Sequence, residues 1–178
     1  MLFRSDENRF LAVPLEPQTS RDSEIGLDYE SLRGRMRAAA YHMDIENEIG
    51  FVPGDLLPPF GSNVNLPPTL HEGVELEAYW ALNRSLNLGG QYSYTVAKFK
   101  EGSFGGADVA GNNIPLVPRH RAGISASVMP LDQLRITGTV TYVGEQYYDN
   151  DQSNSFGREM PAYTVTRSEE HTSELQSQ

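Results

Sequence analysis

The stretch GVELEAYWALNRSLNLGGQYSYTVA (residues 73–97) decides the fold of this chain. Two runs of alternating apolar and polar side chains flank a short polar break at residues 83–85. Because side chains on a strand alternate between its two faces, the stretch predicts an antiparallel hairpin with one apolar and one polar face. The residues of the apolar parity are Val74, Leu76, Ala78, Trp80 and Leu82, then Leu86, Leu88, Gly90, Tyr92 and Tyr94.

The length of these strands points to a membrane. Each has about ten to twelve residues, whereas about five or six is usual in a soluble domain, and about ten is enough to cross a bilayer at a tilt. No apolar run approaches the roughly 18 residues that a transmembrane helix needs, and the mean hydropathy is -0.47. Low hydropathy is compatible with a transmembrane barrel, because only alternate residues face lipid.

Composition excludes several other classes of protein. The chain has no cysteine, which excludes a disulfide framework or a thiolate metal site. Its formal net charge is -10, and its two lysines are accompanied by no basic run, so nucleic-acid binding is disfavoured. The first residues lack the basic and apolar segments of a signal peptide, so for an exported protein we expect the true N-terminus to lie upstream.

Strands and connections alternate along the whole chain. Strands are predicted over residues 21–29, 35–46, 122–128 and 134–142, besides the hairpin, and a last one begins at Pro161. The apolar parity takes Ile25 and Leu27 in the first strand. In the second it is assigned to Ala39, Tyr41, Met43 and Ile45.

Short and long connections alternate in a regular order. The breaks at residues 30–34, 83–85 and 129–133 are short, whereas those at 47–72, 98–118 and 145–160 are long. Outer-membrane barrels have short periplasmic turns and long extracellular loops. The predicted fold is therefore all-β: antiparallel up-and-down strands, about six and a stub, forming a partial segment of a large transmembrane β-barrel.

The two faces of this sheet have different expected surroundings. Trp80, close to a short turn, is expected in the inner aromatic girdle, with an ordinary core tryptophan as the alternative. The polar parity includes Glu75 and Glu77, which indicates a wet interior or a polar plug. About six strands cannot close such a barrel, and an open edge in lipid is costly, so we expect a piece of a larger barrel.

The last twelve residues, RSEEHTSELQSQ (167–178), abandon the alternation of the preceding strand. Their sequence resembles the in-frame translation of a widely used sequencing adapter. We therefore expect residues 1–166 to be the barrel segment and residues 167–178 to be an artefactual, disordered tail. A natural polar tail is the alternative.

Six short pieces carry a family resemblance: residues 15–18, 24–27, 47–49, 73–78, 113–120 and 161–165. In their order and spacing, the chain resembles the C-terminal part of the barrel of a TonB-dependent outer-membrane receptor. The resemblance implies a 22-stranded barrel blocked by a plug domain, with import powered through the TonB complex. It also implies the Gram-negative cell outer membrane as the location, outer-membrane lipid as a neighbour, and a small nutrient ligand such as an iron-siderophore or cobalamin.

No catalytic constellation emerges from the sequence, so no enzyme, cofactor or metal is predicted. His42, His71 and His120 lack ligand spacing. Glu75 and Glu77 are read as carboxylates paired with a plug or a neighbouring strand, and less readily as an acid/base pair. Residues 149–151 offer calcium ligands but lack the pattern of a calcium loop. The predicted ligand contacts in the extracellular loops are Tyr147, Tyr148, Asp149 and Asp151.

Four functions remain open from sequence alone. The first is an active, TonB-dependent nutrient receptor, and the second is a passive porin-like or other outer-membrane barrel, which lacks plug and coupling segments. The third is an outer-membrane enzyme, which requires a Ser/His or Asp/His constellation. The last is a soluble adhesion sandwich, whose connections need not sort by length.

Overall fold

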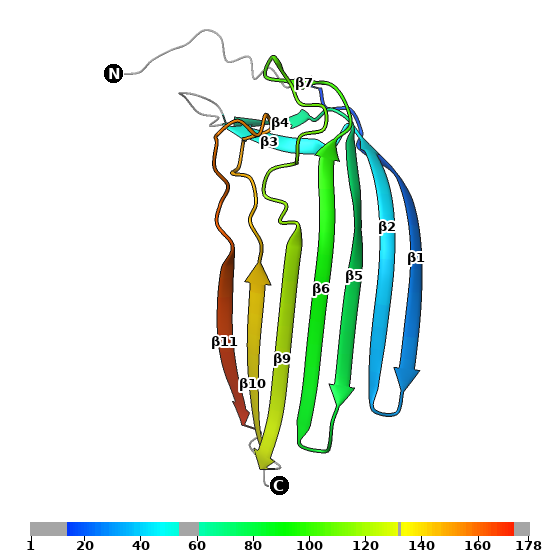
Figure 1. The fold of residues 1–178 in the computed structure, drawn as a ribbon, viewed down its shortest axis with the longest axis vertical. Helices are drawn as coiled ribbons and strands as arrows, with labels where there is room; N and C mark the ends of the chain where they lie inside the picture. The colour runs from blue at the N-terminus through cyan, green and yellow to red at the C-terminus, as the bar shows by residue number, and fades with distance from the viewer. Residues whose placement is uncertain (1–13, 54–60, 132, 173–178) are drawn as a thin grey trace, which may run out of the picture.

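A computed structural model of the chain describes residues 14–53, 61–131 and 133–172. They form an antiparallel seven-stranded sheet in the order β1-β2-β5-β6-β9-β10-β11, with two small two-stranded sheets at one end (Figure 1). Each strand of the large sheet is adjacent to its neighbours along the chain, and the sheet does not close on itself, which confirms the predicted fold. Its strands are β1 (Thr19–Ser31), β2 (Gly34–Glu46), β5 (Thr69–Ala81), β6 (Leu86–Phe99), β9 (His120–Leu131), β10 (Leu134–Val143) and β11 (Tyr163–Thr172).

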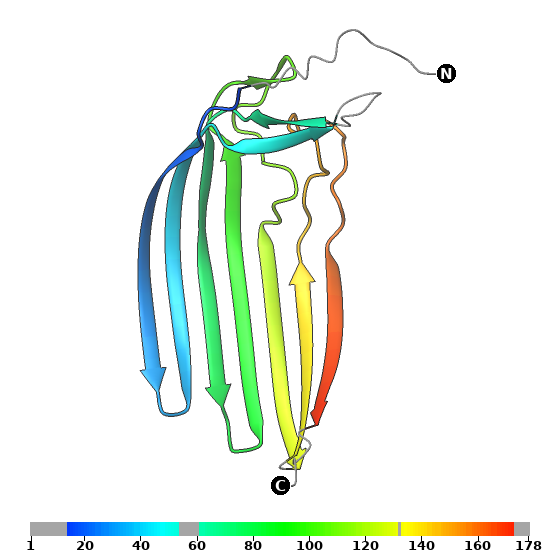
Figure 2. The same cartoon turned by 180° about the vertical axis from the view of Figure 1, so that it is seen from behind.

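Short and long connections lie at opposite ends of the sheet. The short turns that follow β1, β5 and β9 lie together at one end, and the three long connections lie at the other (Figures 1 and 2). This arrangement confirms the predicted alternation of short and long connections. Within the described ranges, no helix is long and apolar enough to span a membrane.

The register places the apolar side chains of neighbouring strands side by side, since directly opposed residues share a face. One row runs Ile25, Ala40, Val74 and Tyr94, and the next Leu27, Ala38, Leu76, Tyr92, Ala122 and Tyr142. We call the surface formed by these rows, and by the rows below them as far as Leu86, Val128 and Ile136, the apolar face. Ile25, Leu27 and Ile124 on it are 76%, 77% and 64% exposed, so nothing in the described chain covers them.

The height of the apolar face matches a membrane. Along β6 the residues of this parity run from Leu86 to Val96, ten residue steps, which is about 34 Å along the strand. A tilt of about 40° reduces this to about 26 Å, close to the apolar band of outer-membrane barrels. Trp80 lies on this face at the end with the short turns, the place predicted for it, with its ring over Gly34.

The opposite surface, which we call the polar face, carries most of the charges of the strands. One of its rows runs Asp28, Arg37, Glu77, Gln91, Gly123 and Thr141. The prediction for residues 73–97 is thus confirmed on both faces.

In β2 the predicted face is wrong. Ala39, Tyr41, Met43 and Ile45 lie opposite Glu75, Gly73, His71 and Thr69, which places them on the polar face. The physical reason is that apolar side chains change face along this strand. Met36 and Ala38 belong to the apolar face, whereas Ile45, 6% exposed, is buried near the loops.

The end of β11 also differs from expectation. Arg167 to Thr172 pair with β10 in continuous register, whereas the sequence analysis expects disorder from Arg167 onward. Residues 173–178 lie outside the described part. The unpaired backbone groups of β10 explain this, because an edge strand accepts almost any sequence through its main chain. Side chains, however, do not follow the pattern: β11 turns Thr164, Thr166, Ser168 and Glu170 toward the apolar face.

Two small hairpins within the long connections were not predicted. The first, β3 (Ile49–Pro53) with β4 (Gly61–Asn65), crosses the end of the sheet (Figures 1 and 2). The second, β7 (Ser103–Phe104) with β8 (Ala107–Asp108), turns through Gly105 and Gly106, whose φ angles are 59° and 83°. A two-residue turn with two positive φ angles strongly favours glycine.

Candidate functional site

The long connections form one layer over the end of the sheet. We call the described residues of the connections 47–68, 100–119 and 144–162 the loop layer. The backbone N–H of Lys100 donates to Pro68 O at 2.8 Å, and that of Leu116 donates to Tyr147 O at 3.1 Å. Each connection is therefore bonded to a neighbour, and the loop layer is a continuous structure.

Two asparagines join the second and third connections. Asn113 N–H donates to Asn154 Oδ1 at 2.7 Å, and Asn154 Nδ2 donates back to Asn113 O at 2.9 Å. Asn154 Nδ2 also reaches Asp151 O at 3.0 Å. Asn154 has a φ of 52°, a conformation that asparagine tolerates better than most residues.

A small apolar core supports the loop layer from beneath. Phe99 is 1% exposed and Val109 is not exposed at all; both pack with Ala97 and Ile114. Leu66, Phe104 and Val117 pack against this cluster, so the first and second connections both contribute to it. The end of β6, which extends beyond the first residue of β9, pairs with β5 on one edge and bonds to residues 111–114 of the second connection on the other.

A buried polar group links β5 to the first connection. Thr69, completely buried, donates its hydroxyl hydrogen to Glu48 Oε2 at 2.6 Å, and His71 Nε2 lies 3.3 Å from the same oxygen. Burial acts to raise the pKa of Glu48, but the hydrogen bonds with His71 and Thr69 outweigh it and lower the pKa. The carboxylate therefore stays ionised and holds the start of the connection against the strand.

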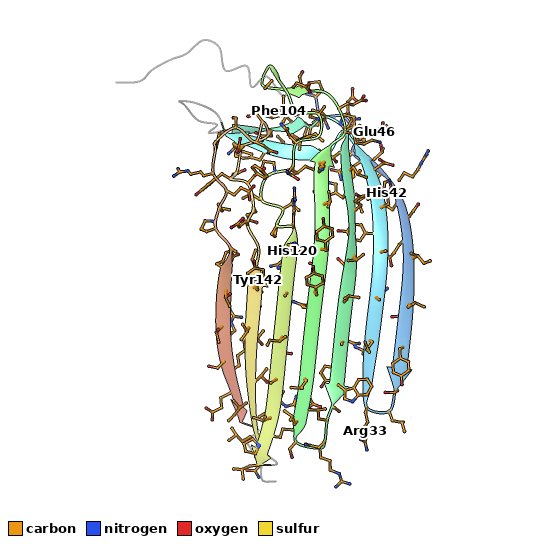
Figure 3. All side chains as sticks on the ribbon, viewed as in Figure 1. Arg33, His42, Glu46, Phe104, His120 and Tyr142 are labelled. Atoms are coloured by element: carbon orange, nitrogen blue, oxygen red, sulfur yellow. The ribbon has the colours of Figure 1, made fainter. Side chains whose placement is uncertain are left out.

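A cleft opens at the base of the loop layer. It has a volume of about 510 Å³, and among its lining residues are Thr95, Asn113, Arg119, His120, Tyr142, Glu145, Tyr147 and Glu159. Arg119 donates to Asn113 Oδ1 at 3.3 Å, and the Tyr92 hydroxyl lies 2.9 Å from His120 Nδ1. Both cationic and anionic groups thus face this space. Figure 3 shows His120 and Tyr142 near the tops of their strands, below the loop layer.

The four predicted ligand contacts lie in different surroundings. Tyr147 lines the cleft, and Tyr148 lies under the Arg158 guanidinium, 5.4 Å from its ring centre. Asp149 is exposed. Asp151 is fully buried, and its carboxylate accepts the N–H groups of Ser155 at 2.7 Å and Phe156 at 3.2 Å. We therefore assign Asp151 to the internal structure of its loop rather than to a ligand.

Sequence reasoning missed most of the cleft. Arg119, Glu145 and Glu159 were not singled out, because nothing local distinguishes them from other loop charges. Arg119 and His120 do belong to segment 113–120, one of the pieces that carry the family resemblance. That membership was the one sequence feature that could have pointed to them. In the described residues, no three His, Cys, Asp or Glu side chains converge to hold a metal ion.

The polar face carries a second open cleft and exposed ion pairs. Arg35 lies 3.1 Å from Glu77, as predicted for a pair between neighbouring strands, and Arg37 lies 3.7 Å from Asp28. These side chains are 54–76% exposed, so the pairs contribute little to stability. The cleft, about 560 Å³, is lined by residues that include Glu24, Arg37, Glu75, Gln91 and Arg121. The polar face is therefore suited to contact a polar surface of another protein segment.

Comparison with known proteins gives a consistent result. The ferrichrome outer membrane transporter/phage receptor of Escherichia coli K12 is 29% identical over 156 residues, covering 84% of this chain and 19% of the transporter. The iron-regulated outer membrane virulence protein of Vibrio cholerae is 25% identical over 161 residues, covering 84% of this chain and 24% of that protein. This chain thus spans about a quarter or less of the length of these relatives.

Solved structures share the fold. The ferric yersiniabactin uptake receptor from Yersinia pestis superposes with a TM-score of 0.65 at 22% identity, over 86% of this chain and 22% of the receptor. A family model described as TonB dependent receptor-like, beta-barrel, matches residues 4–167, nearly the whole chain. The chain belongs to the TonB-dependent receptor-like β-barrel family.

Proposed function

We propose that this chain forms part of the wall and the extracellular loops of an active transport receptor in the outer membrane of a Gram-negative bacterium. The receptor captures a scarce nutrient, such as an iron-siderophore, cobalamin or a similar small ligand, and imports it with energy coupled through TonB. The family match over residues 4–167 carries this proposal. The relative named as a ferrichrome transporter supports a siderophore as ligand.

The two faces of the sheet fit this role. The apolar face is exposed and about as tall as the bilayer interior, so we place outer-membrane lipid against it. The polar face, with its open cleft of about 560 Å³, then lies inside the barrel, where a plug domain supplied by the rest of the receptor contacts it. Residues 1–166 make one segment of this barrel, and strands from elsewhere in the receptor pair with its two open edges.

Ligand contacts come from the loop layer. Tyr147 faces the cleft of about 510 Å³, where Arg119 supplies a positive group. Tyr148 and Asp149 lie next in the same loop, so we retain these three as ligand contacts. The role is binding and transport rather than catalysis. We assign no cofactor, metal or nucleic-acid partner to the segment.

Uptake by the intact receptor that carries this chain tests the proposal. Cells that depend on this receptor are supplied with a panel of ⁵⁵Fe-labelled siderophores, with and without TonB. We expect uptake of at least one siderophore that requires TonB, and the variant Y147A/Y148A/D149A should raise the ligand concentration for half-maximal binding about ten-fold or more. A matched variant, S153A/S155A, changes the same loop outside the cleft and should leave binding unchanged.

The passive barrel predicts a different result. A porin-like pore admits solutes down their gradient, so its uptake continues without TonB and does not saturate at low ligand concentration. Uptake that is equal in cells with and without TonB would therefore contradict active transport and favour the pore.

A further inference from the structure

The polar face is divided into two halves of different chemistry. Over β1, β2 and β5 it carries acidic side chains and arginines, all of them exposed, among them Glu24, Asp28, Arg35, Arg37, Glu75 and Glu77. We call this part the charged half. Over β6, β9 and β10, drawn green to yellow in Figure 1, the same face carries hydroxyl side chains that are half-buried. We call six of them the hydroxyl track: Ser93, Thr95, Ser125, Ser127, Thr139 and Thr141.

Glycines let side chains of this half lie along the wall instead of projecting from it. A Cβ added at Gly89 would lie only 2.5 Å from Ser125 Oγ, so this hydroxyl occupies the space that the glycine leaves. In the same way, a Cβ added at Gly123 would lie 3.0 Å from Gln91 Nε2. Because glycine allows such a close approach, the surface over β6 and β9 stays low and polar.

Three clefts follow the hydroxyl track from the loop layer toward the short turns. The cleft of about 510 Å³ is lined partly by Thr95, and the cleft of about 560 Å³ partly by Ser93, the next residue of the polar face along β6. A third cleft, of about 320 Å³, shares Gln91 with the second. The charged residues of the polar face on β6, β9 and β10 are Arg121, which lines the second cleft, and Arg135, near a short turn. The open space that begins at the proposed ligand contacts thus continues along a surface with few charges.

We propose that the ligand moves along the hydroxyl track from the cleft below the loop layer into the barrel, while the charged half faces the plug. A hydroxyl group both donates and accepts hydrogen bonds, so it binds the oxygen and nitrogen atoms of a passing chelate and exchanges them readily. A site on a transport path must bind weakly enough to release, whereas fixed charges bind an ionic group more strongly. The track therefore suits a ferric chelate without net charge, such as Fe³⁺ with three hydroxamate groups. This inference rests on the proposed function, since it requires the polar face to line the interior of a receptor.

Single cysteines test the division of the polar face, because the chain contains none of its own. S125C and T139C place a thiol on the hydroxyl track, and the matched variant A39C places one on the charged half, also at a half-buried position. Cells that make the intact receptor are treated with a maleimide during uptake, and labelling is read by mass spectrometry. We expect both track thiols to react about ten-fold faster or more than A39C, because the plug covers the charged half. Equal rates at the three positions would overturn the inference.

Adducts of two sizes on the same thiol then test passage. A small methylthio adduct or a bulky maleimide adduct is formed on S125C, and uptake is measured with a neutral ⁵⁵Fe-trihydroxamate and an anionic ⁵⁵Fe-tris-catecholate. We expect the bulky adduct to lower TonB-dependent uptake of the trihydroxamate about ten-fold or more and to leave its binding at the cell surface unchanged. The small adduct should leave both unchanged. T139C is treated in the same way, so the result does not depend on the folding of one variant.

Other outcomes separate the inference from the proposed function. Uptake that is unchanged by the bulky adduct at both positions would overturn the inference alone. So would a loss of surface binding together with uptake, because the track would then belong to the capture site. Failure to import the trihydroxamate, although another siderophore of the panel is imported with TonB, would overturn it as well. Uptake of the trihydroxamate that is equal with and without TonB would instead overturn the proposed function, and the inference with it.

Discussion

The β5–β6 hairpin and β11 have the same antiparallel backbone pairing, but their outward side chains differ: those of the hairpin are apolar and those of β11 are polar. The outward residues of the hairpin include Leu76, Trp80 and Leu88, whereas β11 presents Thr166, Ser168 and Glu170 at equivalent positions. Main-chain hydrogen bonds accept either sequence, since every residue but proline carries the same donor and acceptor. Side chains, however, determine whether a strand is compatible with lipid. Continuous pairing alone therefore does not establish that residues 167–172 cross a membrane.

The genomic DNA sequence across codons 166 and 167 tests whether the polar end of β11 belongs to the natural protein. We predict that the genomic reading departs from RSEEHTSELQSQ after Thr166 and restores apolar side chains at positions 168 and 170. A long-read sequence through this junction is the measurement. Finding the same twelve residues encoded in the genome would show that β11 is native and polar.

A charged substitution on the apolar face tests whether the outward side chains of the β5–β6 hairpin face lipid. We expect L76R to lower the free energy of unfolding of the intact receptor by about 2–4 kcal/mol, because it places a guanidinium in the bilayer interior. The control Q91R, at the neighbouring row of the polar face, should cost less than about 1 kcal/mol. Urea unfolding in lipid vesicles measures both. Equal costs for the two variants would mean that the faces are not divided between lipid and water.

Gly34 and Gly138 compare two glycines of the same apolar face. A Cβ at Gly34 would clash with the Tyr79 carbonyl oxygen and lie 2.5 Å from the Trp80 ring, whereas a Cβ at Gly138 would meet nothing within 4 Å. We therefore expect G34A to destabilise the receptor by about 1–3 kcal/mol and G138A to be neutral or slightly stabilising. Urea unfolding again provides the values. A neutral G34A would show that Trp80 does not pack on the glycine.

The loop layer can be opened without changing the sheet. N154A removes the bonds to Asn113 and Asp151, and places alanine at a positive φ, so local opening should become easier by about 1–3 kcal/mol. Proteolysis of the loops at low protease concentration measures it. The exposed Asn63 offers a control, N63A, which should be cleaved as wild type. Equal cleavage of N154A and wild type would argue against the asparagine link.

The smallest effect concerns acid. The folded pKa of Glu48 is lowered, so its contribution to stability is complete above its ordinary value of 4.5 and is lost as pH falls through the lowered value. Loop proteolysis should therefore increase at acid pH in wild type, and E48Q should show less of this increase. Parallel pH profiles for the two proteins would contradict the assignment to Glu48.

Sequence patterns predicted the parts of the fold that repeat and missed those that depend on contacts between loops. Strict alternation was sufficient for residues 73–97, because one face is apolar throughout. In β2 the alternation was misleading, since Tyr41 is placed by its 3.1 Å hydrogen bond to Thr95 and Ile45 by burial near the loops. The cleft, likewise, gathers Arg119, Glu145 and Tyr147 from segments far apart in sequence. No local sequence pattern identifies residues that only the folded structure brings together.

The turn at Gly105 and Gly106 sets how freely the cell surface of such a receptor can vary. Phe104 packs against the apolar core of the loops at the base of this hairpin, while a Cβ added at either glycine would meet nothing within 4 Å. Side chains placed at this turn therefore meet no existing contact. In the receptor proposed above, this turn is a protrusion whose side chains can change while the apolar core beneath it stays intact, so recognition by antibodies and capture of a nutrient would be separable in this loop.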